Sequence, residues 1–277
     1  MINRQTYEIF SQGSTTYFYS SLFFPREIKE DVFKLYSYMR TADDFCDNIP
    51  QDKKGFETFK KNTYKALKKG KSNDKIIQNI VDIHKKYDCK KEWLDAFLDA
   101  MQSDFENMKC ETMEDSKKYM YGSAEVVGLY ITAILSLPKR SRESAKMLGR
   151  SMQYINFLRD IKEDNKLSRQ YIPQTSVNKH GLESLEETEA RKKPKAFKNM
   201  MREEIKRYRK WSKQGEKGFK HIPKRMLIPI KTANDLYHWT AKQIEKDPFK
   251  IYNKKITPTK AVVGTKLISN AWSIERK

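Results

Sequence analysis

Apolar residues recur along most of the chain at spacings of three and four, the pattern of amphipathic helices. The segment between Pro25 and Pro50 is typical, with apolar positions at Ile28, Val32, Leu35, Tyr36 and Met39. The same pattern predicts further helices over residues 53–67, 74–87, 93–108, 115–137 and 141–164. Most prolines stand where a predicted helix begins or ends, because proline cannot donate the hydrogen bond that a helix interior requires. No segment has the period of two that is typical of a strand, so the pattern predicts an all-α fold.

The helical pattern weakens after Pro173, in a stretch rich in Lys and Glu that runs to Pro194. Helices are predicted again over residues 195–216, 223–245 and 257–274. The sequence contains neither an internal repeat nor a linker long enough to divide it. The chain of 277 residues is long enough to bury one substantial core, so we expect a single domain over residues 1–277.

The cysteine content and the lack of targeting signals favour a cytoplasmic protein. The three cysteines, Cys46, Cys89 and Cys110, have no C-x-x-C spacing and do not make a disulfide framework or a thiolate metal site. The first ten residues lack the apolar region of a signal peptide. The longest apolar run, over residues 126–137, is shorter than the roughly 20 residues that span a membrane. We therefore expect a cytoplasmic location and no transmembrane segment.

The net charge of +20 raises the question of an anionic partner. Lysine doublets are spread along the chain rather than gathered, and no nucleic-acid recognition motif accompanies them. A basic, nucleic-acid-binding helical protein is therefore a remote alternative, and nucleic acid is not an expected partner. The charge is better explained by anionic substrates and by peripheral contact with an anionic membrane surface.

Carboxylates continue the core-facing stripe of the first predicted helix. Asp43 and Asp47 lie one turn apart on this stripe, and Asp44 lies beside them. Inward-facing carboxylates repel each other and are costly to bury, and a hard divalent cation such as Mg²⁺ removes both problems. A solvated helix end is the other explanation of this spacing, and Asp95 and Asp99, which share it, are interpreted as structural.

A second polar stripe lies on the predicted helix over residues 141–164. It consists of Gln153, Asn156, Asp160 and Asp164, at steps of three, four and four, with apolar residues beside it. Such a row is better explained as one wall of a polar cavity in a bundle than as surface. Two carboxylate pairs on inward-facing helices can hold metal ions between them, and a ligand that needs several Mg²⁺ ions is best explained as a diphosphate.

Three stretches of the chain resemble the squalene and phytoene synthase family of head-to-head prenyl transferases. They are YSSLFFPREIKEDVFKLYSYMRTADDFCD, YMYGSAEVVGLY and QYINFLRDIKEDNKLSRQYIP. The similarity spans residues 14–173 and is thin after Pro173. It implies an isoprenoid synthase-type helical bundle with a central active-site cavity and one aspartate motif on each side.

The resemblance also implies roles for the residues that match the family's motifs. Mg²⁺, or Mn²⁺ in its place, would be held by Asp43, Asp44, Asp47, Asp160 and Asp164. Substrate would be bound by Ser14, Thr16, Tyr17, Gln153, Asn156, Asp104 and Arg169. The catalytic positions would be the cavity tyrosines and two arginines that meet diphosphate oxygens: Tyr36, Tyr121, Arg40 and Arg159.

A few positions depart from the family's pattern. Glu125 stands where many members carry a small residue next to a helix kink, and we expect it to alter the shape of the cavity. Ser168 replaces the usual Gly before the R-x-Y-x-P stretch. Lys254 and Lys255 lie near a basic position of the family, but the match there is too loose to assign a role.

The function implied is a Mg²⁺-dependent condensation of two prenyl diphosphates in isoprenoid and carotenoid biosynthesis. The forms YMYGSAEVVG and RQYIP, and a C-terminus without a membrane anchor, favour a phytoene synthase. Two geranylgeranyl diphosphates would then give phytoene through prephytoene diphosphate, with release of diphosphate and without NADPH. A squalene or dehydrosqualene synthase acting on farnesyl diphosphate is the alternative, and a non-catalytic member of the fold is less favoured. The apolar faces of residues 93–108 and 122–137 either line a tunnel for the substrate chains or are plain core.

Overall fold

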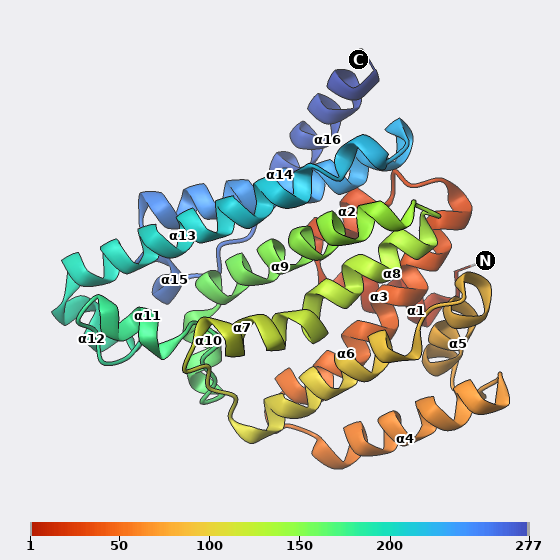
Figure 1. The fold of residues 1–277 in the computed structure, drawn as a ribbon, viewed down its shortest axis with the longest axis horizontal. Helices are drawn as coiled ribbons and strands as arrows, with labels where there is room; N and C mark the ends of the chain where they lie inside the picture. The colour runs from red at the N-terminus through yellow and green to blue at the C-terminus, as the bar shows by residue number, and fades with distance from the viewer. Residues whose placement is uncertain (1, 276–277) are drawn as a thin grey trace.

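Helices account for all regular secondary structure between residues 2 and 275, the part of the chain that this computed structural model describes (Figure 1). The one pairing of extended backbone in that range is an isolated bridge between Lys109 and Gln170. The prediction of an all-α fold is therefore confirmed. None of the helices in the same range is both long enough and apolar enough to cross a membrane.

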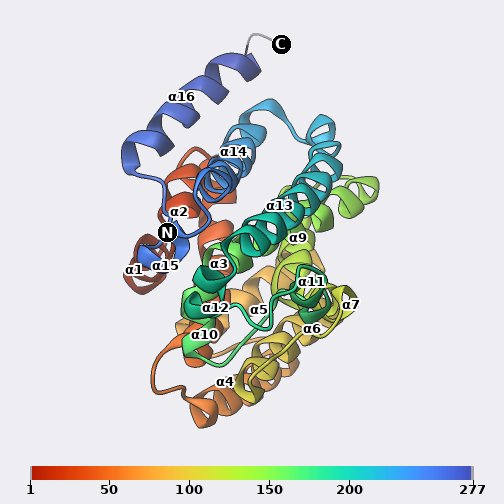
Figure 2. The same cartoon turned by 90° about the vertical axis from the view of Figure 1, so that its left-hand side faces the viewer.

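The longest helices form layers around a central space. Seen end-on, α13 (Pro194–Glu216) and α14 (Lys224–Lys246) lie above α9 (Arg142–Arg159) and α3 (Arg26–Asp47) (Figure 2). At the opposite edge of the molecule lies α4 (Lys53–Lys69), far from α13 in both views. Each of these helices has an apolar face buried toward the interior, which is what their sequence period predicts.

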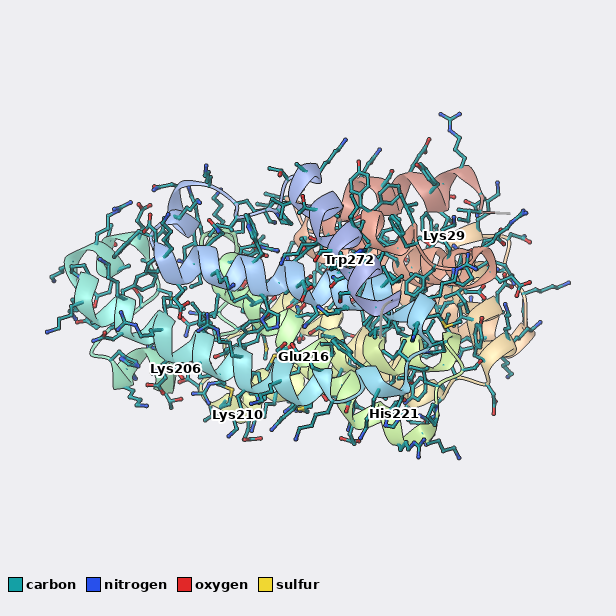
Figure 3. The ribbon with its side chains drawn as sticks, turned by 90° about the horizontal axis from the view of Figure 1, so that it is seen from above. Lys29, Lys206, Lys210, Glu216, His221 and Trp272 are labelled. Atoms are coloured by element: carbon teal, nitrogen blue, oxygen red, sulfur yellow. The ribbon has the colours of Figure 1, made fainter. Side chains whose placement is uncertain are left out.

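The other helices surround this arrangement. Those that pack near the centre are α2 (Thr15–Ser21), α5 (Lys75–Tyr87), α6 (Lys91–Ser103), α7 (Met113–Met120) and α8 (Val126–Ile134). The rest are α1 (Arg4–Gly13), α10 (Ile161–Lys166), α11 (Gln174–Lys179), α12 (Glu187–Lys192), α15 (Lys250–Asn253) and α16 (Lys260–Glu275). Seen from above, α14 lies between α13 and α16, and Trp272 is on α16 (Figure 3).

Two N-terminal helices were not predicted, because they are short and their apolar period is brief. The Asn3 side chain caps α1 by accepting from the Thr6 amide, and Ser14 caps α2 by accepting from the Tyr17 amide at 3.2 Å. Phe10 of α1 stacks on Tyr36 of α3, with ring centroids 3.9 Å apart. Tertiary packing against α3 thus stabilises α1. A helix this short needs such packing, because it is only marginally stable alone in water.

The helix predicted over residues 115–137 is wrong as a single element. It consists of α7, a π-helical turn at Tyr121–Glu125 and α8, which ends at Ile134. At the π turn Gly122 packs closely on α6, because a Cβ there would lie 2.2 Å from the Ala96 carbonyl oxygen. Glu125 is buried in the same turn and is paired with Arg150 at 2.6 Å.

The helix predicted over residues 141–164 is also interrupted. α9 ends at Arg159, the Asp160 backbone has φ −100° and ψ 13°, and α10 begins at Ile161. The helical i→i−4 hydrogen bonds are retained on both sides of the break. The Asp160 amide donates to the Asn156 carbonyl at 2.8 Å, and the Asp164 amide donates to the Asp160 carbonyl at 2.9 Å. The polar stripe therefore keeps its spacing across the break.

Candidate active site

A cavity of about 700 Å³ lies among α2, α3, α8, α9 and α14. Charged groups are part of its lining, and they come from the C-terminal parts of α3 and α9, from the segment that follows α9, and from the positions just after α6 and α15. Much of the remaining lining is apolar or aromatic. The cavity therefore joins a strongly polar region to space that suits a hydrocarbon chain.

The last two turns of α3 carry the first carboxylate motif. Asp43 and Asp47 line the cavity, as the periodicity predicted. Arg40 lines it too and binds both Asp43 Oδ2, at 2.9 Å from Nη1, and Asp44 Oδ1, at 2.6 Å from Nη2. Asp44 itself is not among the lining residues, and its side chain is 39% exposed. The structure thus places two of the three carboxylates of this motif in the cavity and Asp44 beside them.

The second motif forms the opposite wall. Its members in the lining are Gln153, Asn156, Arg159, Asp160 and Asp164, all of which the sequence predicted as site residues. Arg159 Nε donates to Asp160 Oδ1 at 2.7 Å. The Oδ1 atom of Asn156 is buried and has no hydrogen-bond partner in the described part of the chain. A buried acceptor without a donor is costly, so a ligand group or water that donates to it would be stabilised here.

The carboxylates of the two motifs are close enough to influence one another. Burial and then the charge of Asp47 raise the pKa of Asp43 above its usual range. Burial and then the charges of Asp160 and Asp47 raise the pKa of Asp164 well above its usual range. Because Asp47 belongs to the first motif and Asp164 to the second, the two motifs face each other across the cavity.

This set of oxygens fits hard divalent cations. Carboxylates with raised pKa values are poorly compensated by the protein, and Mg²⁺ prefers carboxylate, phosphate and water oxygens. Within residues 2–275, no three His, Cys, Asp or Glu side chains lie close enough together to hold a metal ion. Ions bound here would therefore need oxygens from an anionic ligand and from water, as Mg²⁺ sites with phosphates commonly have.

Asp104 organises a cluster of aromatic rings at the cavity wall. Its carboxylate accepts from the hydroxyls of Tyr119 and Tyr171, each at 2.7 Å. Burial raises the pKa of Asp104 to about 6, although the Arg169 charge and the two hydroxyls lower it. The Tyr171 ring stacks on Phe157, with centroids 4.6 Å apart. All of these residues line the cavity, so the position predicted for Asp104 agrees with the structure.

The prediction of a cavity position for Tyr121 is wrong. Tyr121 is 38% exposed and is not among the lining residues, whereas Tyr119 is buried and lines the cavity. Residues two positions apart on a helix point in nearly opposite directions, so only one of the two tyrosines can face inward. The tyrosine of this segment in the cavity wall is therefore Tyr119. Glu125 is not in the lining either, because its carboxylate is turned toward Arg150.

The N-terminal residues predicted to bind substrate lie in the lining. These are Ser14, Thr16 and Tyr17, and the predicted catalytic Tyr36 lies with them. The Ser14 hydroxyl is engaged as the cap of α2. Burial raises the pKa of Tyr36 and of Tyr17 far above the usual range, so both phenols are neutral at physiological pH. A neutral phenol is a weak nucleophile, so neither side chain brings a reactive anion into the cavity.

Besides Tyr119, three lining residues with charged or phenolic side chains were not predicted as site residues. Lys255 follows α15 and brings its Nζ to 3.7 Å from Asp160 Oδ1. Tyr237 of α14 lines the cavity with its ring centroid 5.8 Å from that of Tyr17. Tyr171, in the R-x-Y-x-P stretch, is the third. The sequence offered two signals for them, the paired lysines at 254–255 and the family-matched Tyr171. Only the tertiary fold, however, brings these positions to the cavity.

Both apolar segments in question contribute to the cavity wall. The lining residues from them, apart from the polar Asp104, Ser123 and Thr132, are Phe97, Met101, Ala124, Val127, Gly128, Ile131 and Leu137. Other residues of the same segments, such as Leu94 and Leu98, are buried in the core instead. The segments therefore serve partly as core and partly as the wall of the apolar space.

Asp95 and Asp99 are structural, as predicted. Asp95 accepts from Lys91 and from the Tyr64 hydroxyl at 2.8 Å, and Asp99 is paired with Lys60 at 2.8 Å. Neither is a lining residue of the cavity. The four-residue spacing of two aspartates is thus shared by a cavity motif and a surface pair, and only their surroundings separate them.

Comparison with known proteins supports the resemblance seen in the sequence. A family model described as squalene/phytoene synthase matches residues 10–263. Phytoene synthase 1 of Arabidopsis thaliana is 23% identical over 90% of this chain and 61% of its own length. A 4,4'-diapophytoene synthase of Staphylococcus haemolyticus is 25% identical over 66% of each chain. The chain thus spans about three fifths of the length of the plant relative.

Solved structures share the fold at lower identity. A dehydrosqualene synthase in complex with a ligand superposes with a TM-score of 0.86 at 17% identity, over 98% of this chain and 96% of that one. A squalene synthase of Alicyclobacillus acidocaldarius superposes with a TM-score of 0.76 at 18% identity, over 88% and 94%. The isoprenoid synthase-type bundle predicted from the sequence is therefore confirmed.

Replacing Asp43 by Asn should raise or preserve the melting temperature of the metal-free protein. The folded-state pKa of Asp43 lies above that of the unfolded chain, so the charged carboxylate destabilises the fold at neutral and higher pH. As pH falls, the wild-type protein takes up a proton at this site and the advantage of Asn disappears. Thermal unfolding in EDTA between pH 5 and pH 9 measures this difference.

Asp99→Asn is the control, because Asp99 is 70% exposed and lies outside the cavity. Its melting temperature should stay within about 2 °C of wild type, as for most surface substitutions. A lower melting temperature for Asp43→Asn at pH 8 in EDTA would show that the carboxylate is already well compensated.

Proposed function

The chain belongs to the squalene/phytoene synthase family, and we propose that it condenses two prenyl diphosphates head to head. The observation that carries the proposal is the joining, in one cavity, of two facing carboxylate motifs and an apolar space. The motifs suit a diphosphate with its metal ions, and the apolar space suits the isoprenoid chains. A site that only bound an anion would not need the second part.

The polar region would bind and orient the diphosphate groups. Arg40 and Arg159 line it and present guanidinium groups, which form paired hydrogen bonds with phosphate oxygens. Lys255 adds a third cation next to Asp160. When bound, Mg²⁺ held by Asp43, Asp47, Asp160 and Asp164 would supply positive charge against the departing diphosphate.

The aromatic and apolar wall would protect the allylic cation after the diphosphate leaves. Tyr119 and Tyr171 are held by Asp104, and burial raises the pKa of each phenol well above its usual range. Neutral phenols and ring faces stabilise a cation without trapping it as a covalent adduct. The apolar lining excludes water, which would otherwise add to the cation.

We propose geranylgeranyl diphosphate as the substrate, with phytoene as the product and no requirement for NADPH. Support comes from similarity, since plant phytoene synthases match 90% or more of this chain. The diapophytoene synthase relative matches a shorter part, 66% of the chain. Farnesyl diphosphate, giving squalene or dehydrosqualene, is the alternative substrate.

We also propose that a basic face on α13 makes peripheral contact with anionic membranes. Lys206, Lys210 and Lys213 are exposed on one side of this helix, and Figure 3 shows the first two at the surface. None of the three is ion-paired within residues 2–275, so their charge is available to anionic headgroups. A membrane is also where the long-chain substrates and products would partition.

Product analysis tests the choice of substrate. Purified protein with Mg²⁺ and labelled geranylgeranyl diphosphate should give phytoene without NADPH, read by chromatography. Farnesyl diphosphate should be converted more slowly. If hydrocarbon forms only from farnesyl diphosphate with NADPH, and is squalene, the phytoene assignment is wrong and the alternative holds.

The metal-binding role of the two motifs predicts a common set of losses. EDTA should abolish turnover, and Mg²⁺ or Mn²⁺ should restore it. Asp43→Asn and Asp160→Asn should each lower turnover by on the order of 10²-fold, because each removes a charged ligand. Asp95→Asn and Asp99→Asn have the same spacing outside the cavity and should stay within a few-fold of wild type. If the Asp95 and Asp99 variants lost as much turnover as the Asp43 and Asp160 variants, the assignment of the metal site would be wrong.

The membrane contact predicts charge-dependent binding to vesicles. Wild-type protein should co-sediment with vesicles containing phosphatidylglycerol and not with pure phosphatidylcholine. Replacing Lys206, Lys210 and Lys213 by Glu should reduce the bound fraction several-fold. The matched control replaces the exposed Lys53, Lys54 and Lys61 of α4, on the far side of the molecule (Figure 1). Equal loss in both triple variants would show a non-specific effect of net charge.

A further inference from the structure

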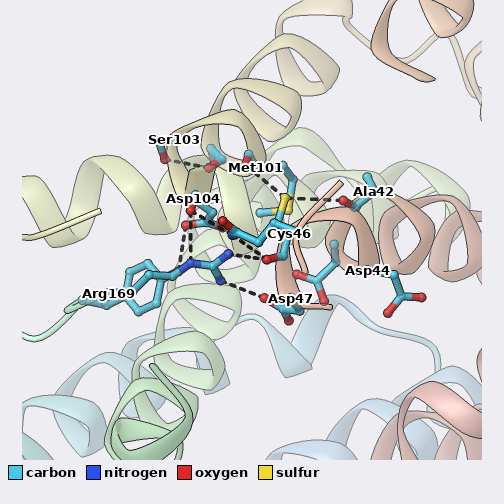
Figure 4. Close-up of polar contacts among 12 residues, drawn as sticks. Ala42, Asp44, Cys46, Asp47, Met101, Ser103, Asp104 and Arg169 are labelled. Atoms are coloured by element: carbon cyan, nitrogen blue, oxygen red, sulfur yellow. Dashed lines mark hydrogen bonds and ion pairs between the residues drawn. The ribbon is translucent and has the colours of Figure 1, made fainter. Parts of the chain in front are cut away.

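All three guanidinium nitrogens of Arg169 donate to protein acceptors next to the first carboxylate motif (Figure 4). Its side chain is 2% exposed. Nη1 donates to Asp47 Oδ1 at 2.8 Å, Nη2 to the Cys46 carbonyl at 2.7 Å, and Nε to the Asp104 carbonyl at 3.2 Å. Each of the three nitrogens therefore has a protein acceptor.

The acceptors belong to two elements that end at the cavity. The Cys46 carbonyl is in the last turn of α3, where helix carbonyls have no partner within the helix. The Asp104 carbonyl follows α6, in the short 3₁₀ turn Asp104–Glu106. A positive charge at the C-terminal end of a helix is stabilised by the helix dipole. Arg169 thus ties the end of α3 to the end of α6.

A second side chain strengthens the same junction. Gln51 Nε2 donates to the Cys46 carbonyl at 2.7 Å and lies 3.4 Å from the Asp104 carbonyl. Both carbonyls therefore have a donor apart from Arg169. The carboxylate of Asp47, in contrast, has Arg169 as its one ion-pair partner in the described chain. Loss of Arg169 should affect Asp47 more than the junction itself.

The backbone around Arg169 is held in place independently of its side chain. Ser168 has φ +56°, and the Arg169 amide donates to the Asp164 carbonyl at 3.0 Å. The Gln170 amide donates to the Met108 carbonyl at 2.8 Å, and the Cys110 amide donates to the Gln170 carbonyl at 2.9 Å. The guanidinium is therefore delivered to Asp47 by a fixed segment rather than by a mobile loop.

We propose that Arg169 is a positioning residue that orients the Asp47 carboxylate for the metal-diphosphate site, and that it does not bind the diphosphate itself. This differs from the substrate-binding role that the sequence resemblance implies. It rests on the proposed function, because it assumes that Asp47 meets the metal ions. The fork of Arg169 reaches one carboxylate oxygen and two carbonyls at once, and the single ammonium of a lysine cannot reproduce that geometry.

A double-mutant cycle separates positioning from direct contact. Binding of Mn²⁺ with inorganic diphosphate is measured by calorimetry for wild type, Arg169→Gln, Asp47→Asn and the double variant. If Arg169 acts through Asp47, the Arg169→Gln substitution should weaken binding about tenfold in the wild-type protein. In the Asp47→Asn background it should weaken binding less than about threefold. If the fold-loss of affinity in the double variant equals the product of the fold-losses in the two single variants, Arg169 contacts the ligand directly and the proposal is overturned.

Controls keep a folding defect apart from the effect sought. Arg209→Gln removes an arginine that is paired with Glu245 on the surface and should leave binding unchanged. Arg169→Lys keeps the charge; if Arg169→Gln does not fold, the same cycle is run with Lys. The melting temperature without metal is a further readout. The Arg169→Lys variant and the Arg169→Lys, Asp47→Asn double variant should have the same melting temperature, because lysine at position 169 no longer holds Asp47. Wild-type protein that binds no Mn²⁺-diphosphate would overturn the proposed function itself, whereas binding with multiplying losses would overturn only the role of Arg169.

Discussion

Repulsion among carboxylates in one enclosed cavity is the constraint on which the rest of the site depends. Within the described residues, five carboxylates line the cavity: Asp43, Asp47, Asp104, Asp160 and Asp164. The cations that line it number four: Arg40, Arg159, Arg169 and Lys255. An arriving diphosphate would add further negative charge. The cavity is therefore incomplete without additional cations, which is the physical reason to expect divalent metal in this site.

The surrounding residues limit this repulsion without removing it. Arg40 and Arg159 pair with aspartates of their own motifs, and Arg169 holds Asp47. Even so, the pKa values of Asp43 and Asp164 stay raised by burial and by neighbouring carboxylates. Because of this unfavourable charge, cations that bind the site would stabilise the protein, since any ligand that binds only the folded chain stabilises it.

Helix irregularities determine which side chains reach the cavity. At the π turn, Tyr121–Glu125, Gly122 packs against α6, and Ser123 and Ala124 lie in the cavity lining. The break at Asp160 separates α9 from α10 but preserves the hydrogen bonds that space Asn156, Asp160 and Asp164. π turns are often found at functional sites. Here the two irregularities lie on adjoining walls of the same cavity.

The sequence by itself determined the helical class, the approximate bounds of α3, α4, α5, α13 and α14, and the two aspartate stripes. These features depend on local spacing, because residues four apart share a helix face wherever the helix lies. The apolar periodicity did not locate the π turn or the break at Asp160, and the family resemblance chose Tyr121 in place of Tyr119. Packing against other helices decides such irregularities, and that information is not local.

Only the tertiary structure decided which charged groups meet. The contact between Arg169 and Asp47 joins positions 122 apart in the chain, and Lys255 approaches Asp160 from beyond α15. It also explains why Asp95 and Asp99, with the same spacing as Asp43 and Asp47, are structural: they are paired with lysines outside the cavity. Electrostatic interaction depends on distance in space, and the order of residues along the chain does not specify that distance.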